Sequence, residues 1–75
     1  MDKPFYVHAT WDDEARVWVA SSDDVPGLAT EAETAEDLVQ KLKILIPELL
    51  ELNGLSPTGS ISFELLTRRL ELAAG

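Results

Sequence analysis

Apolar and polar residues alternate at the start of the chain. Apolar side chains occupy every odd position from residue 5 to residue 11, and this period of two is typical of a half-buried strand. The acidic run at 12–14 predicts a hairpin loop, and residues 15–20, which are rich in β-branched and aromatic side chains, predict a second strand. The first twenty residues therefore predict an antiparallel hairpin.

A turn and a short third strand follow this hairpin. Residues 21–24 are polar and predict a loop, and Pro26 and Gly27 fit the two central positions of a type II turn. Residues 28–32 predict a third strand. This strand is short and polar enough to lie at an edge of the sheet, where charge discourages unwanted pairing.

The middle of the chain carries the pattern of an amphipathic helix. Thr34 is the expected N-cap, with an aspartate three residues further on. Apolar residues recur at helical spacing over residues 38–52 and form one stripe. Because proline lacks a backbone donor and crowds the preceding turn, we expect a kink or a break at Pro47. Asn53 and Gly54 predict the C-terminal end of the helix.

The last part of the chain predicts a loop and one more strand. Residues 56–59 contain serine, proline and glycine and predict the loop. Apolar and polar residues alternate from 61 to 65, which predicts a strand. Beyond residue 65 apolar and polar residues no longer alternate. Residues 66–75 could form a bulged extension of the strand, a short helix, or a segment that docks on another copy of the chain.

The element order is therefore β-β-β-α-β, in one domain over residues 1–75. The first three strands form an antiparallel meander, and the helix crosses over to a fourth strand that lies parallel to the first through a right-handed connection. The predicted spatial order of the strands is 3-2-1-4. We expect an α+β fold with one long, Pro-kinked helix on one face of a four-stranded sheet.

The pattern also assigns side chains to the two faces of this sheet. The face under the helix is expected to hold Phe5, Val7, Val17, Val19, Phe63 and the leucine stripe. The opposite face, which no helix covers, is expected to hold Tyr6, His8 and Trp18. An exposed aromatic patch on a small domain often marks a binding surface. The alternative is that these rings pack on one another or under the C-terminal tail.

Charge narrows the classes of partner. The chain contains 6 Lys and Arg against 14 Asp and Glu, which gives a formal net charge of −8. Such a surface repels phosphate backbones and attracts basic partners. We therefore expect no direct binding of nucleic acid. The acidity either recruits a basic protein or serves solubility alone.

The lack of cysteine and of long apolar runs bears on location. With no cysteine in the chain, disulfides and thiolate metal sites are excluded, and a reducing cytoplasm is suitable. Neither a signal peptide nor an apolar stretch of the ~20 residues that span a bilayer is visible. We expect a soluble, cytoplasmic protein with no membrane partner.

The sequence offers few candidates for catalysis or metal binding. Residues 12–14 and 23–24 are consecutive acids in loops, without the ligand spacing and turn glycine of a calcium-binding loop. His8 is the single candidate base, and it lies in the middle of a strand. The four glycines are scattered, so no phosphate-binding loop is visible. These observations favour a protein that is not an enzyme and that uses no cofactor and no metal.

Several motifs resemble the HicB antitoxin family. Residues 13–20 are similar to the acidic turn and aromatic-valine-alanine strand of that family, and residues 24–28 to its Asp-Leu-Pro-Gly-Cys motif. Residues 30–38 are similar to its Thr-x-Gly-Asp-Thr-x-Glu-Glu-Ala run into the helix. Residues 46–54 are similar to the signature of a short HicB-like family of unknown function. Two alanines, at positions 15 and 32, stand where the family often has small or glycine residues.

The resemblance implies a partial ribonuclease H-like fold and a binding function. HicB antitoxins bind a small basic toxin that cleaves RNA. Nucleases with the larger fold place carboxylates on the first strand, and residues 5–11 contain none, so nuclease activity is disfavoured. No length remains after Gly75 for the DNA-binding domain that many HicB proteins carry, so DNA binding by such a domain is not expected.

Three functions follow in order of preference. The first is an antitoxin-type module that neutralises a small basic toxin through an acidic surface. Its candidate partner-binding residues are aromatic anchors and loop acids: Tyr6, Trp11, Asp12, Asp13, Glu14, Trp18, Asp23 and Asp24. The second is a homodimeric structural or regulatory module without a toxin. The third is a small-molecule or hydrolytic role centred on His8.

Overall fold

A computed structural model describes residues 3–55 and 59–75, so residues 56–58 of the predicted loop lie outside the described residues. The elements are β1 (Phe5–Asp12), β2 (Val17–Ser21), β3 (Ala29–Ala32), α1 (Ala35–Leu52) and β4 (Phe63–Arg68). This is the α+β class and the β-β-β-α-β order that the sequence predicts.

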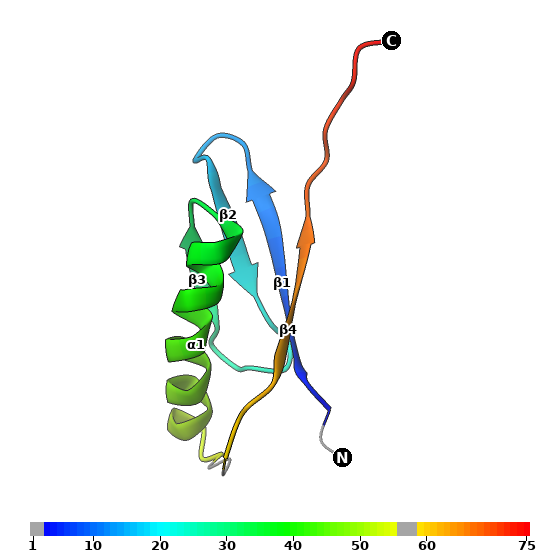
Figure 1. Ribbon diagram of the computed structural model, residues 1–75. Coiled ribbons are helices and arrows are strands. Elements are labelled where there is room, and N and C mark those ends of the chain that lie inside the picture. The colour runs from blue at the N-terminus through cyan, green and yellow to red at the C-terminus, as the bar shows by residue number, and fades with distance from the viewer. Residues whose placement is uncertain (1–2, 56–58) are drawn as a thin grey trace.

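The four strands form one mixed sheet in the order β3-β2-β1-β4. β2 is antiparallel to both of its neighbours, and β4 is parallel to β1, which confirms the predicted topology. α1 lies against one face of the sheet (Figure 1). The opposite face is the open face, formed by alternate strand residues: Tyr6, His8, Thr10, Val17, Val19, Glu31, Glu64 and Leu66.

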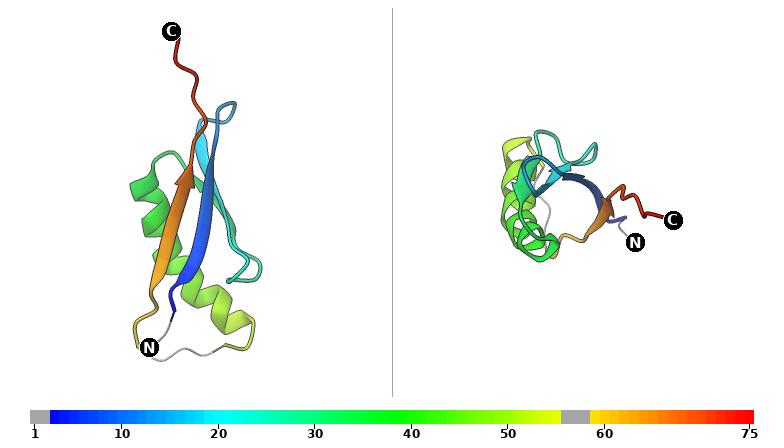
Figure 2. Two further views of the ribbon diagram at one scale, coloured as in Figure 1. Left: turned by 90° about the vertical axis from the view of Figure 1, so that its right-hand side faces the viewer. Right: turned by 90° about the horizontal axis from the view of Figure 1, so that it is seen from above.

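The core lies between α1 and one half of the sheet, because α1 packs over β2 and β3. Its buried residues are all apolar: Val7, Ala9, Ala20, Val25, Leu28, Ala32, Leu38, Leu42, Ile46 and Leu50. The four members from α1 recur at helical spacing, as the apolar stripe predicts. The sheet curves away from α1 toward β4 (Figure 2), where Phe63 and Leu65 are only half-buried.

The structure corrects the predicted faces of β2. Ala20 pairs with the buried Ala9, so Ala20 and Trp18 lie on the face that α1 covers, and Trp18 is half-buried against the core. Val17 and Val19 therefore lie on the open face, where Val19 is 43% exposed. The prediction that both valines face the core and that Trp18 lies opposite them is wrong.

The turn between β1 and β2 explains the reversal. The predicted three-residue loop would place Trp11 opposite Ala15, whereas Trp11 pairs with Trp18, three residues later. Because successive strand residues point to opposite faces, a shift by an odd number reverses every side chain of β2. Arg16 ends the turn with a left-handed φ of 59° and donates its N–H to Asp12 O at 2.8 Å.

α1 begins and ends at the predicted residues. Thr34 Oγ1 accepts a hydrogen bond from the backbone N–H of Asp37 at 3.0 Å, which is the predicted N-cap. At the other end, the N–H groups of Gly54 and Leu55 donate to carbonyls of the last turn at 3.1 and 2.8 Å. Gly54 has a φ of 79°, so this end is a Schellman motif.

Pro47 does not end α1, which runs from Ala35 to Leu52. The missing N–H of Pro47 leaves the carbonyl of Lys43 without its usual donor. Both residues are exposed, so water can bond to that carbonyl and reduce the cost. Of the two predicted alternatives, a kink or a break, the break is therefore excluded.

The C-terminal residues extend β4 and then leave the sheet. β4 continues to Arg68, beyond the alternating stretch 61–65. Residues 69–75 are exposed and project from the body of the molecule (Figures 1 and 2), whose longest dimension is 50 Å. A short helix at 66–75 is therefore excluded.

Candidate partner-binding surface

The predicted partner-binding residues separate into two groups at opposite ends of the sheet. The turn 13–16 follows the C-terminal end of β1, whereas the loop 22–27 follows the antiparallel β2 and returns to the start of β1. The turn end has Trp11, Asp12, Asp13, Glu14 and Trp18, and the loop end has Tyr6, Asp23 and Asp24. The structure does not bring all of them into one site.

The first two acids of the turn end already have partners within the chain. Asp12 Oδ1 accepts hydrogen bonds from two backbone N–H groups of the turn at 3.1 and 3.2 Å, which stabilises the turn. Asp13 Oδ1 accepts from Arg16 Nη1 at 2.7 Å and from Trp11 Nε1 at 3.3 Å. Asp12 therefore shapes the turn, and the guanidinium of Arg16 offsets the charge of Asp13.

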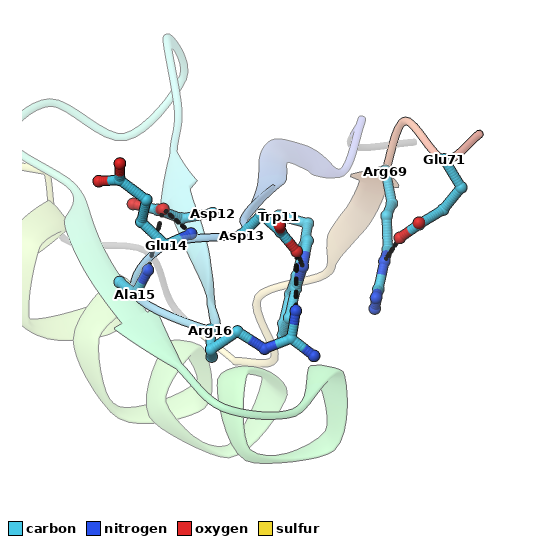
Figure 3. A network of polar contacts seen from close by, with 8 residues as sticks. All are labelled: Trp11, Asp12, Asp13, Glu14, Ala15, Arg16, Arg69 and Glu71. Carbon is cyan, nitrogen blue, oxygen red and sulfur yellow. Dashed lines mark hydrogen bonds and ion pairs between the residues drawn. The ribbon is translucent and has the colours of Figure 1, made fainter.

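Trp11 lies between two guanidinium groups (Figure 3). Its ring centroid is 5.2 Å from Arg16 Cζ and 4.3 Å from Arg69 Cζ, within the range of cation–π contacts. Trp18 meets the same ring edge-on, with centroids 5.2 Å apart. Arg69 also pairs with Glu71. At the turn end, arginines therefore pair with Asp13 and Glu71, and the rings of Trp11 and Trp18 pack together.

Hydrogen bonds hold the loop 22–27 against β1. Ser22 Oγ donates to Tyr6 O at 2.5 Å and accepts from the N–H groups of Asp24 and Val25 at 3.1 and 3.2 Å. Asp24 Oδ2 accepts from the Tyr6 N–H at 2.8 Å. Val25 is fully buried, and Asp23 is exposed beside it. These contacts place both acids of the loop next to Tyr6.

The predicted turn at Pro26 and Gly27 holds the other side of this loop. Gly27 has a φ of 83°, as the third residue of a type II turn requires, and the N–H of Leu28 donates to Val25 O at 3.2 Å. Asn53 Nδ2 donates to Pro26 O at 3.3 Å. The loop is thus fastened to the sheet and to the end of α1.

Ser22→Ala is expected to lower the free energy of unfolding by about 1–3 kcal/mol. The change removes one hydroxyl that serves three hydrogen bonds. Ser21→Ala is the matched control, because Ser21 is exposed, and its effect should stay within about 0.5 kcal/mol. Equal midpoints of chemical denaturation for the two variants would contradict the expectation.

A hollow of about 360 Å³ opens on the open face beside this loop. Its lining consists of Tyr6, His8, Asp23, Asp24 and Leu66. The hollow combines an aromatic ring, an apolar wall and two carboxylates, which suits a long side chain with a cationic tip. The sequence singled out the first four residues. It did not place Leu66 with them, because Leu66 arrives through the long-range pairing of β4 with β1.

A second cleft, of about 540 Å³, lies between α1 and the segment that leads into β4. It forms because α1 packs over β2 and β3 and leaves the β4 half of the sheet less covered. Its apolar lining comes from Leu42, Ile46, Pro47, Leu55, Ile61 and Phe63. Lys43 and Glu51 are the charged residues of this lining.

Over residues 3–55 and 59–75, no group of three His, Asp or Glu side chains could hold a metal ion, and none of the buried residues is polar or charged. Across the same ranges, no helix combines the length and apolar character needed to cross a membrane.

The fold recurs in a protein of known crystal structure. The hypothetical protein TTHA1013 from the extremely thermophilic bacterium Thermus thermophilus is 48% identical, with a TM-score of 0.72, and the match covers 97% of this chain and 100% of that chain. The profile of a family described as a domain of unknown function (DUF1902) matches residues 4–73. The chain belongs to the DUF1902 family. No protein with a curated description matches it.

The DUF1902 match spans all the elements from β1 to β4, and therefore the hollow and the outer edge of β4. The match to TTHA1013 extends over nearly the whole chain, so that protein shares the arrangement of sheet and helix. Neither match names a ligand or a partner. The function of this DUF1902 chain is therefore inferred from its own surface.

Proposed function

We propose that this chain is a non-catalytic binding module that covers a small basic protein with the open face of its sheet. The observation that carries the proposal is the hollow where Tyr6, His8, Asp23, Asp24 and Leu66 meet. It is the place on the open face where an aromatic ring and carboxylates adjoin, and the loop bonds hold it in shape.

The hollow has the chemistry to hold a lysine or arginine side chain. Tyr6 is 41% exposed and offers a ring face to a cation. Asp23 and Asp24 supply charge at the same place, and Leu66 can pack against the methylene stem. The formal net charge of −8 attracts a basic surface from a distance and speeds association.

The HicB-like motifs suggest the class of partner, a small basic toxin that cleaves RNA. In this antitoxin-type role, Tyr6 and Asp23 are the principal contacts among the predicted residues, and Asp24 adds charge while it holds the loop through the Tyr6 N–H. Asp12 and Asp13 bond within the turn, and Trp18 packs on the covered face. The motifs and the hollow have only Asp24 in common, so most of their support comes from different residues.

Reversing one charge in the hollow tests this function. The tagged full chain captures proteins from native lysate at low and high ionic strength, and the captured partner is identified and purified. Asp23→Lys is expected to raise the dissociation constant roughly tenfold or more, most strongly at low ionic strength. Glu14→Lys makes the same charge change at the turn end and is the matched control, with a small expected effect.

Inhibition of the partner gives a second readout. RNA cleavage by the purified partner should be suppressed by the wild-type chain and by Glu14→Lys, and much less by Asp23→Lys at equal concentration. Capture of no basic protein at low ionic strength would count against the whole proposal. Equal losses for the two variants would count against the hollow as the contact site.

A homodimeric module without a toxin is the second candidate function. The exposed outer edge of β4 favours it, since an unpaired strand edge with apolar side chains tends to pair with another strand. Dimerisation through this edge would not block partner binding at the hollow, because the hollow lies on a face of the sheet and the pairing groups lie on its edge.

A further inference from the structure

The outer edge of β4 pairs with no other strand among the described residues 3–55 and 59–75. β4 is last in the order β3-β2-β1-β4, so it pairs with β1 on one side only. Three leucines are exposed along this strand and its extension: Leu66 at 45%, Leu70 at 88% and Leu72 at 94%. Stable monomers usually shield such an edge, because open apolar edges associate.

The parallel pairing shows which backbone groups of β4 are free. The N–H of Phe5 donates to Ser62 O at 3.0 Å, and Phe5 lies beside Phe63 in the register. A parallel ladder repeats this pattern at every second residue, so the even-numbered residues of β4 direct their N–H and C=O groups at β1. Phe63, Leu65 and Thr67 direct theirs at the free edge.

The edge is also electrically neutral. Residues 59–75 contain two glutamates and two arginines, so the whole formal charge of −8 resides in residues 1–58. Two copies that approach through their acidic surfaces repel each other, whereas two β4 edges do not. A neutral, apolar edge on an acidic molecule suits a second copy of this chain better than it suits a basic protein.

We propose that two copies of the chain pair through β4, antiparallel and symmetric about Leu66. Leu66 then faces Leu66 of the second copy, and Glu64 of each copy faces Arg68 of the other. These are non-hydrogen-bonded pairs, in which side chains approach most closely. The free N–H and C=O groups of Leu65 pair with those of Thr67 across the edge. The two sheets join into one, with both open faces on the same side.

A pairing register other than the one about Leu66 would leave part of the β4 edge without hydrogen-bond partners. A register about Leu70 would match Arg69 with Glu71 of the second copy, but those side chains already pair within one chain. It would also align β4 with the extended tail, so part of the strand edge would stay open. The register about Leu66 pairs β4 with β4 along its length.

Charge reversal at the paired positions gives the first test. Sedimentation equilibrium over a dilution series is expected to show a species of twice the 8.3 kDa chain mass. Glu64→Arg and Arg68→Glu each place like charges opposite each other and should raise the dissociation constant of the dimer roughly tenfold. The double variant E64R/R68E should recover the wild-type value. The two residues are about 13 Å apart along one strand, so recovery must arise between copies.

A proline tests the backbone bonds without a change of charge. Thr67→Pro removes an N–H that points at the free edge and leaves the ladder to β1 in place. It is expected to weaken the dimer roughly tenfold. Thr67→Ala keeps that N–H and is the matched control. Circular dichroism under conditions where both variants are monomeric verifies that each keeps its fold.

The cysteine-free chain allows a direct test of the register. Leu66→Cys places two thiols opposite each other at a Cα separation of about 4.5 Å, which a disulfide can span. Leu66→Cys should cross-link under mild oxidation faster than Leu70→Cys, although Leu70 is the more exposed residue.

Any of three results would overturn the proposal: a wild-type chain that stays monomeric, a double charge variant that does not recover, or faster cross-linking at Leu70. None of these measurements involves Asp23 or a basic partner. Failure of the dimer and failure of partner binding are therefore separate outcomes.

Discussion

Replacing Leu38 with alanine is expected to lower the free energy of unfolding by about 2–5 kcal/mol. Leu38 is fully buried, and its truncation leaves a cavity that the neighbouring apolar side chains can fill only in part. A domain of this size has a small stability margin. Much of that margin should therefore disappear with this one side chain.

Urea denaturation followed by circular dichroism measures the change. All variants are compared at one protein concentration, because self-association would add to the apparent stability. Ile44→Ala is the control on the same helix, since Ile44 is 64% exposed, and it should change the free energy by less than about 0.5 kcal/mol. Equal losses for the two variants would mean that α1 does not bury the apolar stripe.

Trp18→Ala is expected to cost about 2–4 kcal/mol of stability and to leave binding of a basic partner at the hollow unchanged. Trp18 packs against the core on the covered face and meets the Trp11 ring edge-on. Its truncation removes both buried apolar area and an aromatic contact. The neighbouring Val19 lies on the open face, so Val19→Ala should cost less than about 1 kcal/mol.

This pair of variants reports the orientation of β2. In the reversed orientation Val19 would be buried and Trp18 would lie in the open. A greater loss of stability from Val19→Ala than from Trp18→Ala would therefore contradict the observed register. A loss of partner binding in a folded Trp18→Ala variant would contradict its place on the covered face.

The sequence was sufficient to predict α1 because the relevant signals are local. Thr34 caps the first turn through a residue three positions away, and Gly54 ends the last turn through its own backbone conformation. The apolar stripe between them repeats every three to four residues. Pro47 is the exception, because the free-energy cost of its missing N–H depends on whether water reaches the carbonyl of Lys43.

The faces of β2 could not be predicted in the same way. Residues 15–20 carry apolar side chains at odd and even positions, so alternation alone does not choose the buried set. The choice depends on the length of the preceding turn. No glycine or asparagine marks that turn, because Arg16 adopts the left-handed conformation that those residues usually supply.

The grouping of the candidate site residues depends on where the strands end. Tyr6 lies near the start of β1 and Asp12 at its end, which separates them by roughly 20 Å. The length predicted for the first strand already implied that Tyr6 and Asp12 lie far apart. The sequence did not predict that Leu66 lies beside His8, because β4 extends past residue 65, at which the alternation of apolar and polar residues stops.

The parallel pairing of β1 with β4 also affects how the chain folds during translation. This pairing runs from Phe5 beside Phe63 to Thr10 beside Arg68. β1 cannot meet β4 until the ribosome has released the chain as far as β4, which ends at Arg68. The hairpin of β1 and β2 has time to form during translation, but one side of it stays accessible to other nascent chains. Emergence of β4 from the ribosome is therefore the step that protects this hairpin from aggregation.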